Sequence, residues 1–356
     1  MKKIVSLLAL VLAFALCTAC AEGAWNDPEN YRSIFNSVKY DDGIVYVIGH
    51  KSPDTDTVAS AIGYADFRRQ LGLNCEARVS DKPNSETAFA LNYFGLEAPE
   101  ILTDAAGLQM ILVDQNESSQ SIDGMAEATI REIIDHHNLG DFSDDHQILQ
   151  RFAPVGATAT LVYLCYKECG LEIPPQIAGM LASAIMSDTG NLQYAHTAMD
   201  EAALEELCAT AGIDDREAYY IALDTAKCDF GDMTDEEIFF SDYKEYSAGD
   251  YRYGIGCVSF RGEDQLEDLC VRMQNTMEEV IDGSGMNMLF TLIHEKNSGK
   301  QYLLSCGKYA LDAAKLAEFG TLEGDRILIV PSVSRKTVIV PGLAEILENV
   351  NLEEAA

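Results

Sequence analysis

The stretch "VIGHKSPDTDT", residues 47–57, places one histidine and two aspartates within seven residues. It follows the apolar run "GIVYVIG", which predicts a buried parallel strand, and precedes "TVASAIGYADFRRQLG", which predicts an amphipathic helix. His50, Asp54 and Asp56 therefore fall on a loop at the carboxyl end of a strand, where α/β sheets bind ligands. The alternative is helix capping by Asp56 or Thr57, which leaves His50 and Asp54 without a role.

Other predicted elements end in the same residue types. Asp114 closes the run "MILVD", Asp188 follows the predicted helix "AGMLASAIMSD", and the strand "REIIDHH" ends in Asp135, His136 and His137. Taken singly, Asp114 could be a turn residue, Asp188 a helix terminator and His136 a core histidine. Because the ends of parallel strands meet at one edge, these groups converge, as in sites for Mn²⁺ or Mg²⁺.

Six of these side chains form the predicted metal site. They supply one imidazole for each of two ions and enough carboxylate oxygens for both, with one aspartate as a bridge. Two metals roughly 3.5 to 4 Å apart clamp the attacking and the leaving oxygen of a phosphoryl displacement. The expected ligands are His50, Asp54, Asp56, Asp114, His136 and Asp188.

The elements that must position these groups indicate two domains. Over residues 41–226, apolar strands alternate with helical stretches, which predicts an α/β fold with a parallel sheet covered by helices. The pattern changes after residue 226, where we expect a linker over 227–234 and a smaller α+β domain over 235–356. In that domain we expect a helix leading into a strand, then a long helix and a hairpin.

Four segments are similar, in order, to the motifs of the DHH phosphoesterase superfamily: "GHKSPDTD", "ILVDQNE", "IIDHHNLGDF" and "SAIMSDT". The tail "SRKTVIVP" resembles the C-terminal signature of its manganese-dependent, family II inorganic pyrophosphatases. The resemblance implies an active site between the two domains. There, a hydroxide activated by two divalent metals would hydrolyse pyrophosphate to two phosphates, with Mn²⁺ preferred and Co²⁺ or Mg²⁺ as substitutes.

The resemblance also implies a role for each site residue. The two ligand sets, which share a bridging Asp114, are His50, Asp54 and Asp114 for one ion and Asp56, Asp114, His136 and Asp188 for the other. His137 faces the substrate phosphates. Asp135 does not bind the metals but supports the site by fixing the orientation of an imidazole. Gln115 supports the site where the family usually has a histidine, and it cannot take up a proton. The loop 190–197, with Gln193 and His196, lacks the lysine that the family commonly shows there.

A basic segment lies in the second domain of this acidic chain. "VSRKT" places Arg335 beside Lys336, and Lys244 in "DYKEY" matches a lysine that binds substrate in the family. Arginine offers a bidentate fork and lysine a mobile charge, so these cations can offset the charge of pyrophosphate. The alternative is an exposed basic turn between strands. Domain closure would then exclude water from the reaction.

Composition limits the partners of the chain. Its 356 residues include 58 acidic and 25 basic ones, a formal charge of −33, which argues against a nucleic-acid surface. We expect pyrophosphate as the small-molecule substrate, with a homodimer among the assemblies the family resemblance allows. Two rival functions remain open. One is another DHH-type hydrolase of phosphoanhydrides or phosphoesters, such as short polyphosphates, and the other is a catalytically weak surface lipoprotein that binds metal or phosphate.

The first twenty residues read as an export signal, with two lysines, an apolar stretch over residues 4–16 and small residues after it. "CTAC" resembles a lipobox ending at Cys20, which predicts lipid attachment there and an extracytoplasmic, membrane-anchored protein. The alternatives are ordinary cleavage after Ala21, a buried helix over 4–16, and the cytoplasmic location usual for the family. Residues 21–40 read as a polar tether. We expect the eight cysteines after Cys20 to be structural thiols.

Overall fold

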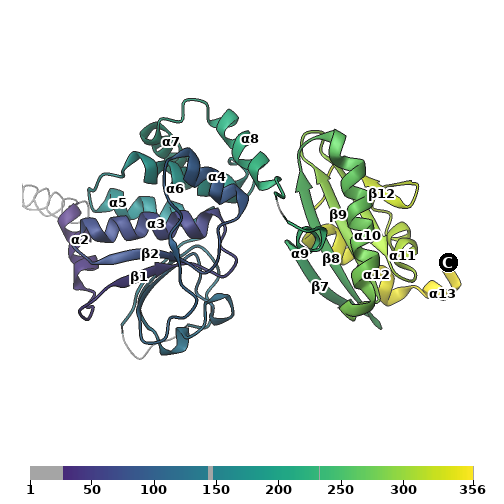
Figure 1. Ribbon diagram of the computed structural model, residues 1–356, viewed down its shortest axis with the longest axis horizontal. Helices are drawn as coiled ribbons and strands as arrows, with labels where there is room; N and C mark the ends of the chain where they lie inside the picture. Colours follow the sequence, from purple (N-terminus) through teal and green to yellow (C-terminus); the bar gives the residue numbers. More distant parts are fainter. Residues whose placement is uncertain (1–26, 143–146, 232, 356) are drawn as a thin grey trace, which may run out of the picture. The chain divides into compact units, whose positions relative to one another are not determined.

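The computed structural model describes residues 27–142, 147–231 and 233–355. The chain divides into two compact units, Met1–Ala226 and Lys227–Ala356, which we call unit 1 and unit 2 (Figure 1). The predicted export signal and its lipidation residue Cys20 lie outside the described residues.

Unit 1 is built on a six-stranded sheet with the order β3-β2-β1-β4-β5-β6, in which every neighbouring pair is parallel. Its central strands are apolar and β-branched because both faces of a parallel sheet are buried. Side chains alternate between the faces, so Val47 and Ile111 join one core and Met110 and Leu112 the other. The strands are β1 (Val45–Ile48), β2 (Cys75–Val79), β3 (Glu100–Ile101), β4 (Gln109–Val113), β5 (Thr129–Asp135) and β6 (Leu149–Phe152).

Helices cover one face of this sheet, and Figure 1 shows α3 and α5 lying on it. The other face is covered by the connections between residues 102 and 128, which bury Ile122 and Met125 against it. The predicted α/β fold is therefore confirmed, with connections in place of helices on the second face. The helices are α2 (Pro28–Ser37), α3 (Thr55–Gln70), α4 (Ser85–Tyr93), α5 (Thr158–Glu168), α6 (Pro175–Thr189), α7 (Ala198–Ala211) and α8 (Arg216–Lys227), with the short turns η1 (Ser118–Gln120) and η2 (Met125–Glu127).

Helix α2 corrects the prediction of a polar tether over residues 21–40. Asp27 caps the helix by accepting a hydrogen bond from the Glu29 N–H at 3.0 Å, and Pro28 occupies its first turn. Phe35 is buried against Phe67, with 4.9 Å between ring centroids. Arg32 Nε also donates to the Cys169 carbonyl oxygen at 2.7 Å. The tether prediction was wrong over this stretch because these contacts dock a capped helix on unit 1.

Unit 2 carries a six-stranded mixed sheet with the order β11-β12-β10-β9-β8-β7. Helices α9 and α10 pack on one face and helices α11 and α12 on the other, each over its own apolar core. The predicted α+β domain is confirmed. Its strands are β7 (Tyr243–Ala248), β8 (Tyr251–Phe260), β9 (Met288–Glu295), β10 (Lys300–Cys306), β11 (Thr321–Glu323) and β12 (Arg326–Ile329). Its helices are α9 (Asp235–Phe240), η3 (Glu263–Gln265), α10 (Leu266–Ser284), α11 (Ala310–Leu316), η4 (Arg335–Ile339), α12 (Val340–Asn349) and α13 (Leu352–Ala355).

One local prediction for unit 2 was wrong, and one of the alternatives is excluded. The single strand expected after α9 is a hairpin, β7–β8, which turns at Gly249 with a φ of 56°. A side chain there would meet the Leu347 carbonyl oxygen at 2.7 Å, so the position requires glycine. The basic segment is also not a turn between strands, because Ser334 caps η4 and the chain continues directly into α12.

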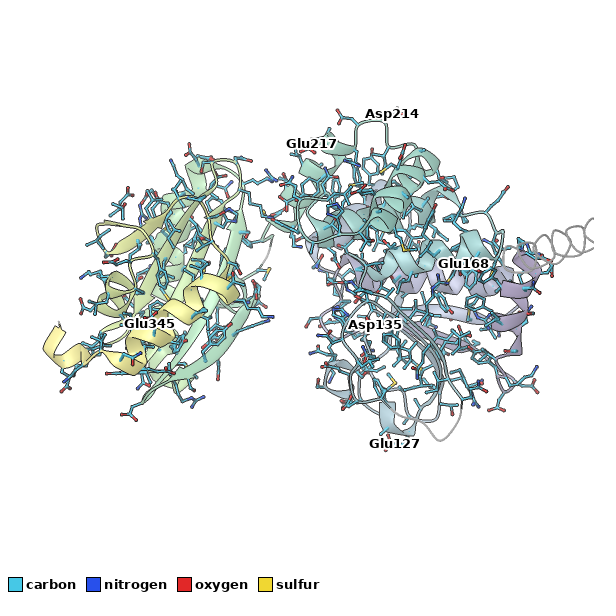
Figure 2. The ribbon with its side chains drawn as sticks, turned by 180° about the vertical axis from the view of Figure 1, so that it is seen from behind. Glu127, Asp135, Glu168, Asp214, Glu217 and Glu345 are labelled. Carbon is cyan, nitrogen blue, oxygen red and sulfur yellow. The ribbon has the colours of Figure 1, made fainter. Side chains whose placement is uncertain are left out.

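Acidic residues lie both at the surface and in the interior of unit 1, and the cysteines form no disulfide among the described residues. Figure 2 shows Asp135 inside unit 1, where it is fully buried, while Glu127 and Asp214 lie exposed at the surface. All eight cysteines after Cys20 are free thiols, five of them buried and three half-buried. Within the ranges that the structure describes, no helix combines the length and the apolar character needed to cross a membrane.

Candidate active site

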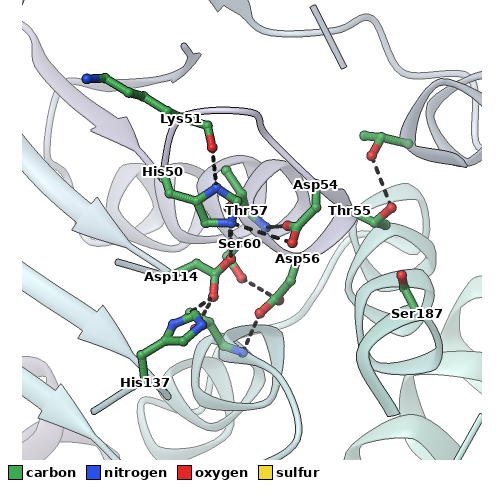
Figure 3. A network of polar contacts seen from close by, with 12 residues as sticks. His50, Lys51, Asp54, Thr55, Asp56, Thr57, Ser60, Asp114, His137 and Ser187 are labelled. Carbon is green, nitrogen blue, oxygen red and sulfur yellow. Dashed lines mark hydrogen bonds and ion pairs between the residues drawn. The ribbon is translucent and has the colours of Figure 1, made fainter. Parts of the chain in front are cut away.

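Side chains from five elements of unit 1 converge at the carboxyl end of its sheet, and Figure 3 shows His50, Asp54, Asp56 and Asp114 facing one another. Metal-ligating atoms come within 4.8 Å of one another in three overlapping groups. These groups are His50, Asp54 and Asp114; Asp56, His136 and Asp188; and Asp114, His136 and His137. All six predicted ligands are therefore brought together, with His137 beside them.

The start of α3 fixes the two aspartates of the first motif. Asp54 is the N-cap and accepts a hydrogen bond from the Thr57 N–H at 2.9 Å, so Asp54, and not Asp56 or Thr57, caps the helix. Asp56 is completely buried and accepts from the backbone N–H groups of Thr158 at 2.6 Å and Ala159 at 2.9 Å. The first turn of α5 thus holds Asp56 in place, while Asp54, whose side chain is 44% exposed, lies with its Oδ2 3.5 Å from His50 Nε2.

Asp114 occupies the centre of the cluster. It follows β4 with a φ of 58°, a left-handed conformation that aspartate tolerates better than most residues. Its Oδ2 lies 3.4 Å from His50 Nε2, and its Oδ1 lies 3.5 Å from His136 Nε2. Hydroxyl groups of Thr57 and Thr158 donate to these same two oxygens, at 2.8 and 3.1 Å. Each oxygen of one buried carboxylate therefore faces a different imidazole, as a bridging ligand requires.

Backbone carbonyl groups set the orientation of both imidazoles. His50 Nδ1 lies 2.7 Å from the Lys51 carbonyl oxygen, and His136 Nδ1 lies 3.0 Å from the Val155 carbonyl oxygen. A carbonyl can only accept, so each Nδ1 carries the proton and donates it. Nε2 of both rings is then the atom turned toward the carboxylates, which is the arrangement of metal-binding histidines. The donor set fits divalent cations that prefer oxygen and imidazole ligands.

The electrostatics of the cluster favour a cation. Burial raises the pKa of Asp56 well above its ordinary value, and the neighbouring carboxylates of Asp114, Asp188 and Asp54 raise it further. Burial alone would lower the pKa of His50, but its hydrogen bonds with Asp114 and Asp54 raise it to about 11. Carboxylates that oppose one another's ionisation in a buried site are stabilised by a bound metal ion.

His137 differs from the two other histidines. Its Nδ1 lies 2.9 Å from Asp135 Oδ1, and its side chain is 54% exposed. Burial would raise the pKa of Asp135, yet hydrogen bonds from His137 and Asn116 lower it, so Asp135 accepts as a carboxylate. The hydrogen bond with Asp135 raises the pKa of His137. Asp135 thus holds the His137 ring through its Nδ1 atom.

A cavity of about 420 Å³ opens beside the cluster. Gln115, buried on its wall, donates from Nε2 to the Gly49 carbonyl oxygen at 2.9 Å and accepts from Ser121 Oγ at 2.7 Å. Its amide therefore joins the ends of β1 and β4. The other residues that line the cavity are His50, Lys51, Ser52, Asp114, Asn116, Glu117, Gln120 and His137.

Sequence reasoning missed the neutral groups that support the site. Thr158 is the first residue of α5 and does not follow a predicted strand. Asn116 belongs to the motif "ILVDQNE", but no role was predicted for it. In the 190–197 loop, His196 Nε2 lies 3.1 Å from Glu201 Oε1, so this histidine is paired away from the ligand groups found in the described ranges.

The predicted cations of unit 2 gather near one another. Lys244 lies opposite Ile255 in the β7–β8 pair, and Arg335 Nη1 donates to the Ile255 carbonyl oxygen at 3.2 Å. Both charges also act on the Cys257 thiol, whose pKa burial nevertheless raises to about 11. Lys244 and Lys336 are exposed, and neither forms an ion pair with a residue that the structure describes. We call Lys244, Arg335 and Lys336 the cationic face.

Two family models match the chain, one in each half. The DHH family N-terminal domain matches residues 44–185, and the DHHA2 domain matches residues 221–346. The manganese-dependent inorganic pyrophosphatase of Bacillus subtilis strain 168 is 34% identical over 304 residues, which are 85% of this chain and 98% of the Bacillus chain. A Methanococcus jannaschii crystal structure assigned to the family II inorganic pyrophosphatases is 32% identical, with a TM-score of 0.65 over 85% of this chain and 99% of that one.

A parallel sheet with carboxylates and imidazoles at its strand ends, followed by a DHHA2 domain, defines the two-domain DHH class. Within that class, the chain belongs to the family of manganese-dependent, family II inorganic pyrophosphatases. The resemblance seen in its motifs is confirmed.

Proposed function

We propose that this protein hydrolyses inorganic pyrophosphate to two phosphates with the help of two divalent metal ions, Mn²⁺ being preferred. The observation that carries the proposal is the position of Asp114, whose two oxygens face His50 and His136 between the two ligand groups. The names of the Bacillus and Methanococcus relatives support it.

The residues that would hold the metals are those of the two convergent groups. His50, Asp54 and Asp114 would bind one ion, and Asp56, Asp114, His136 and Asp188 the other. When bound, such ions neutralise developing charge on phosphoryl oxygens and lower the pKa of water. Proton release from His50 would accompany metal binding, because a ligating imidazole must be neutral at the ligand nitrogen.

Protein groups would bind and orient the substrate. Asp135 accepts the Nδ1 proton of His137, which leaves Nε2 of this cavity-lining residue to contact a phosphate oxygen. On unit 2, Lys244, Arg335 and Lys336 provide positive charge for a highly charged anion in a protein with a formal charge of −33. We assign His137 and the cationic face to substrate binding.

A phosphate-release assay tests this function. The full chain is stripped with a chelator, loaded with Mn²⁺, Co²⁺ or Mg²⁺, and supplied with pyrophosphate. We expect complete loss of activity on stripping and recovery on reloading, with Mn²⁺ giving the highest rate. Tight metal binding without phosphate release would instead indicate the rival metal-binding or phosphate-binding protein.

Short polyphosphates are a second candidate substrate. The cavity is lined by Lys51 and Gln120 as well as by His50, Asp114 and His137, and its volume of about 420 Å³ falls within the roughly 300–1,000 Å³ of small-molecule sites. Rates with pyrophosphate and tripolyphosphate separate the two candidates. A tripolyphosphate rate equal to or above the pyrophosphate rate would favour the longer substrate.

We propose separately that residues 1–20 are a lipoprotein signal and that Cys20 carries lipid on the outer side of the cytoplasmic membrane. The charged start, the apolar stretch over 4–16 and the small residues before Cys20 support this, and the DHH match begins only at residue 44. The test is Cys20→Ala with membrane fractionation and mass measurement. A variant that fractionates and migrates like the wild type, with its N-terminus intact, would restore the cytoplasmic location.

A further inference from the structure

Arg335 is held by an acidic residue to which the proposed function assigns no role. Its Nη1 donates to the Asp242 backbone carbonyl oxygen at 2.7 Å, and its Nη2 donates to Asp242 Oδ1 at 2.6 Å. The Arg335 side chain is only 12% exposed, whereas that of Asp242 is 55% exposed. Asp242 therefore fixes this arginine with both its main chain and its side chain.

These contacts occupy one edge of the guanidinium group. An arginine presents five N–H donors in a planar fork, with Nη1 and Nη2 at its end and Nε and Nη2 along its side. Asp242 takes the end edge, and among the residues with described positions Nε of Arg335 donates to no oxygen atom. The Cys257 thiol also interacts with this guanidinium group. Without an oxygen acceptor among the described residues, the side edge can serve a ligand that accepts two parallel hydrogen bonds, which is how phosphate binds arginine.

Arg272, on the same unit, shows the opposite arrangement. Its Nε and Nη2 both donate to Asp235 Oδ1, at 2.8 and 2.6 Å. In this ion pair the side edge of Arg272 is occupied by the Asp235 carboxylate. Two Arg–Asp pairs of equal length in unit 2 therefore differ in the edge of the arginine that the aspartate occupies.

Asp242 also links Arg335 to the strand that carries Lys244. The Asp242 carbonyl oxygen, which accepts from Arg335, also accepts the Cys257 N–H of β8 at 3.0 Å. Lys244 follows two residues later on β7 and pairs with Ile255, whose carbonyl oxygen accepts from Arg335. The relative position of Arg335 and Lys244 thus depends on the contacts of Asp242 together with the Ile255 carbonyl group.

We propose that Asp242 is a positioning residue of the cationic face, which holds Arg335 with its side edge open to phosphate and beside Lys244. The proposal rests on the proposed function, because that function assigns phosphate binding to Arg335. A carboxylate near an anion site also repels the anion. The binding energy gained by orienting Arg335 must therefore exceed the repulsion between the Asp242 carboxylate and the bound anion. If it does, removal of the Asp242 side chain raises KM for pyrophosphate.

The experiment compares Asp242→Ala with Asp235→Ala in the full chain loaded with Mn²⁺. We expect Asp242→Ala to raise KM for pyrophosphate about tenfold, the equivalent of one charge-assisted hydrogen bond, with a smaller change in kcat. Asp242→Asn should stay closer to the wild type, because its Oδ1 still accepts from Nη2. Asp235→Ala should leave both constants unchanged, and adding Asp242→Ala to Arg335→Ala should have no further effect.

Each other outcome overturns the proposal. A lower KM in both Asp242 variants would mean that the carboxylate acts only by repulsion, and a KM equal to that of Asp235→Ala would mean that the ion pair is structural. Circular dichroism and metal content establish that the variants fold. If the wild type releases no phosphate, the proposed function fails. Calorimetric binding of imidodiphosphate to the same variants then decides on Asp242 separately.

Discussion

Unit 1 and unit 2 present functional groups of opposite charge, and they hold them in opposite ways. In unit 1 the central carboxylate, Asp114, accepts hydrogen bonds from the neutral hydroxyl groups of Thr57 and Thr158. In unit 2 the central cation, Arg335, is held by the carboxylate of Asp242. Neutral donors fix the position of a carboxylate without cancelling its charge, so unit 1 retains its affinity for cations.

Burial differs between the two regions as well. Asp56 and Asp114 are 0% and 2% exposed, whereas Lys244 and Lys336 are exposed. Burying charge is costly unless it is compensated, while an exposed lysine costs little. We therefore expect the unit 1 site to depend on a bound ion for its stability and the cationic face of unit 2 not to. Each half of this comparison can be tested by removing the group at its centre.

The largest effect is expected for Asp114→Asn. The amide group has no negative charge and only one accepting atom, so it cannot serve two ions at once. We expect pyrophosphate hydrolysis to fall about a hundredfold or more and metal content, measured by elemental analysis, to fall with it. Asp41→Asn, at an exposed aspartate of the same unit, is the matched control and should change neither quantity. Retention of more than a tenth of wild-type activity would refute Asp114 as the bridge.

The next effect is expected for Arg335→Ala. Loss of a bidentate phosphate contact should raise KM and reduce kcat/KM by roughly ten- to a hundredfold. Metal content should stay at the wild-type value, because no described group of metal ligands includes a residue of unit 2. Arg272→Ala removes the arginine of the other pair and should leave kcat/KM unchanged. Loss of metal in Arg335→Ala would contradict the assignment of metal binding to unit 1 and of substrate binding to unit 2.

Metal removal should affect the two units unequally. In the chelator-treated protein we expect faster amide hydrogen exchange at the ends of β1 and β4 and in the first turn of α3, because unpaired buried carboxylates then repel one another. Exchange in β8 and β9 should be the same with and without Mn²⁺. Peptide-resolved hydrogen exchange measures both. Equal protection of unit 1 in the two states would show that its cluster is stable without an ion.

The ligands of unit 1 could be predicted because they stand at recognisable positions next to predicted strands and helices. His50 and Asp114 follow apolar strands and His136 follows the mixed strand "TIREIID", so their place at strand ends follows from the strand pattern. Thr158 could not be found in this way. It reaches Asp114 from the start of α5, and its role arises only when the helix packs on the sheet.

Unit 2 was harder to predict, because the roles of its residues also arise only from contacts between segments far apart in the sequence. Strand β7 is an exposed edge strand with the sequence "YKEYSA", which lacks the apolar alternation that would separate it from β8. Asp242 gave no signal in a chain with 58 acidic residues, because any single acid fits a solvated surface. Its role depends on Arg335, 93 positions away in the sequence.

The smallest effect is expected for Ser121→Ala, which tests how rigid the unit 1 site must be. Ser121 Oγ donates to Gln115 Oε1, and this fixes the amide so that Gln115 Nε2 donates to the Gly49 carbonyl oxygen. Without the hydroxyl, the buried Gln115 oxygen loses its donor at a cost of about 1 kcal/mol, and the ends of β1 and β4 are less firmly joined. We expect thermal stability to fall slightly and kcat to fall a few-fold with unchanged KM, since no phosphate contact is lost. Ser119→Ala removes an exposed hydroxyl of the same loop as a control. If both serine variants behave alike, Gln115 does not position Asp114, and the site needs only its charged residues.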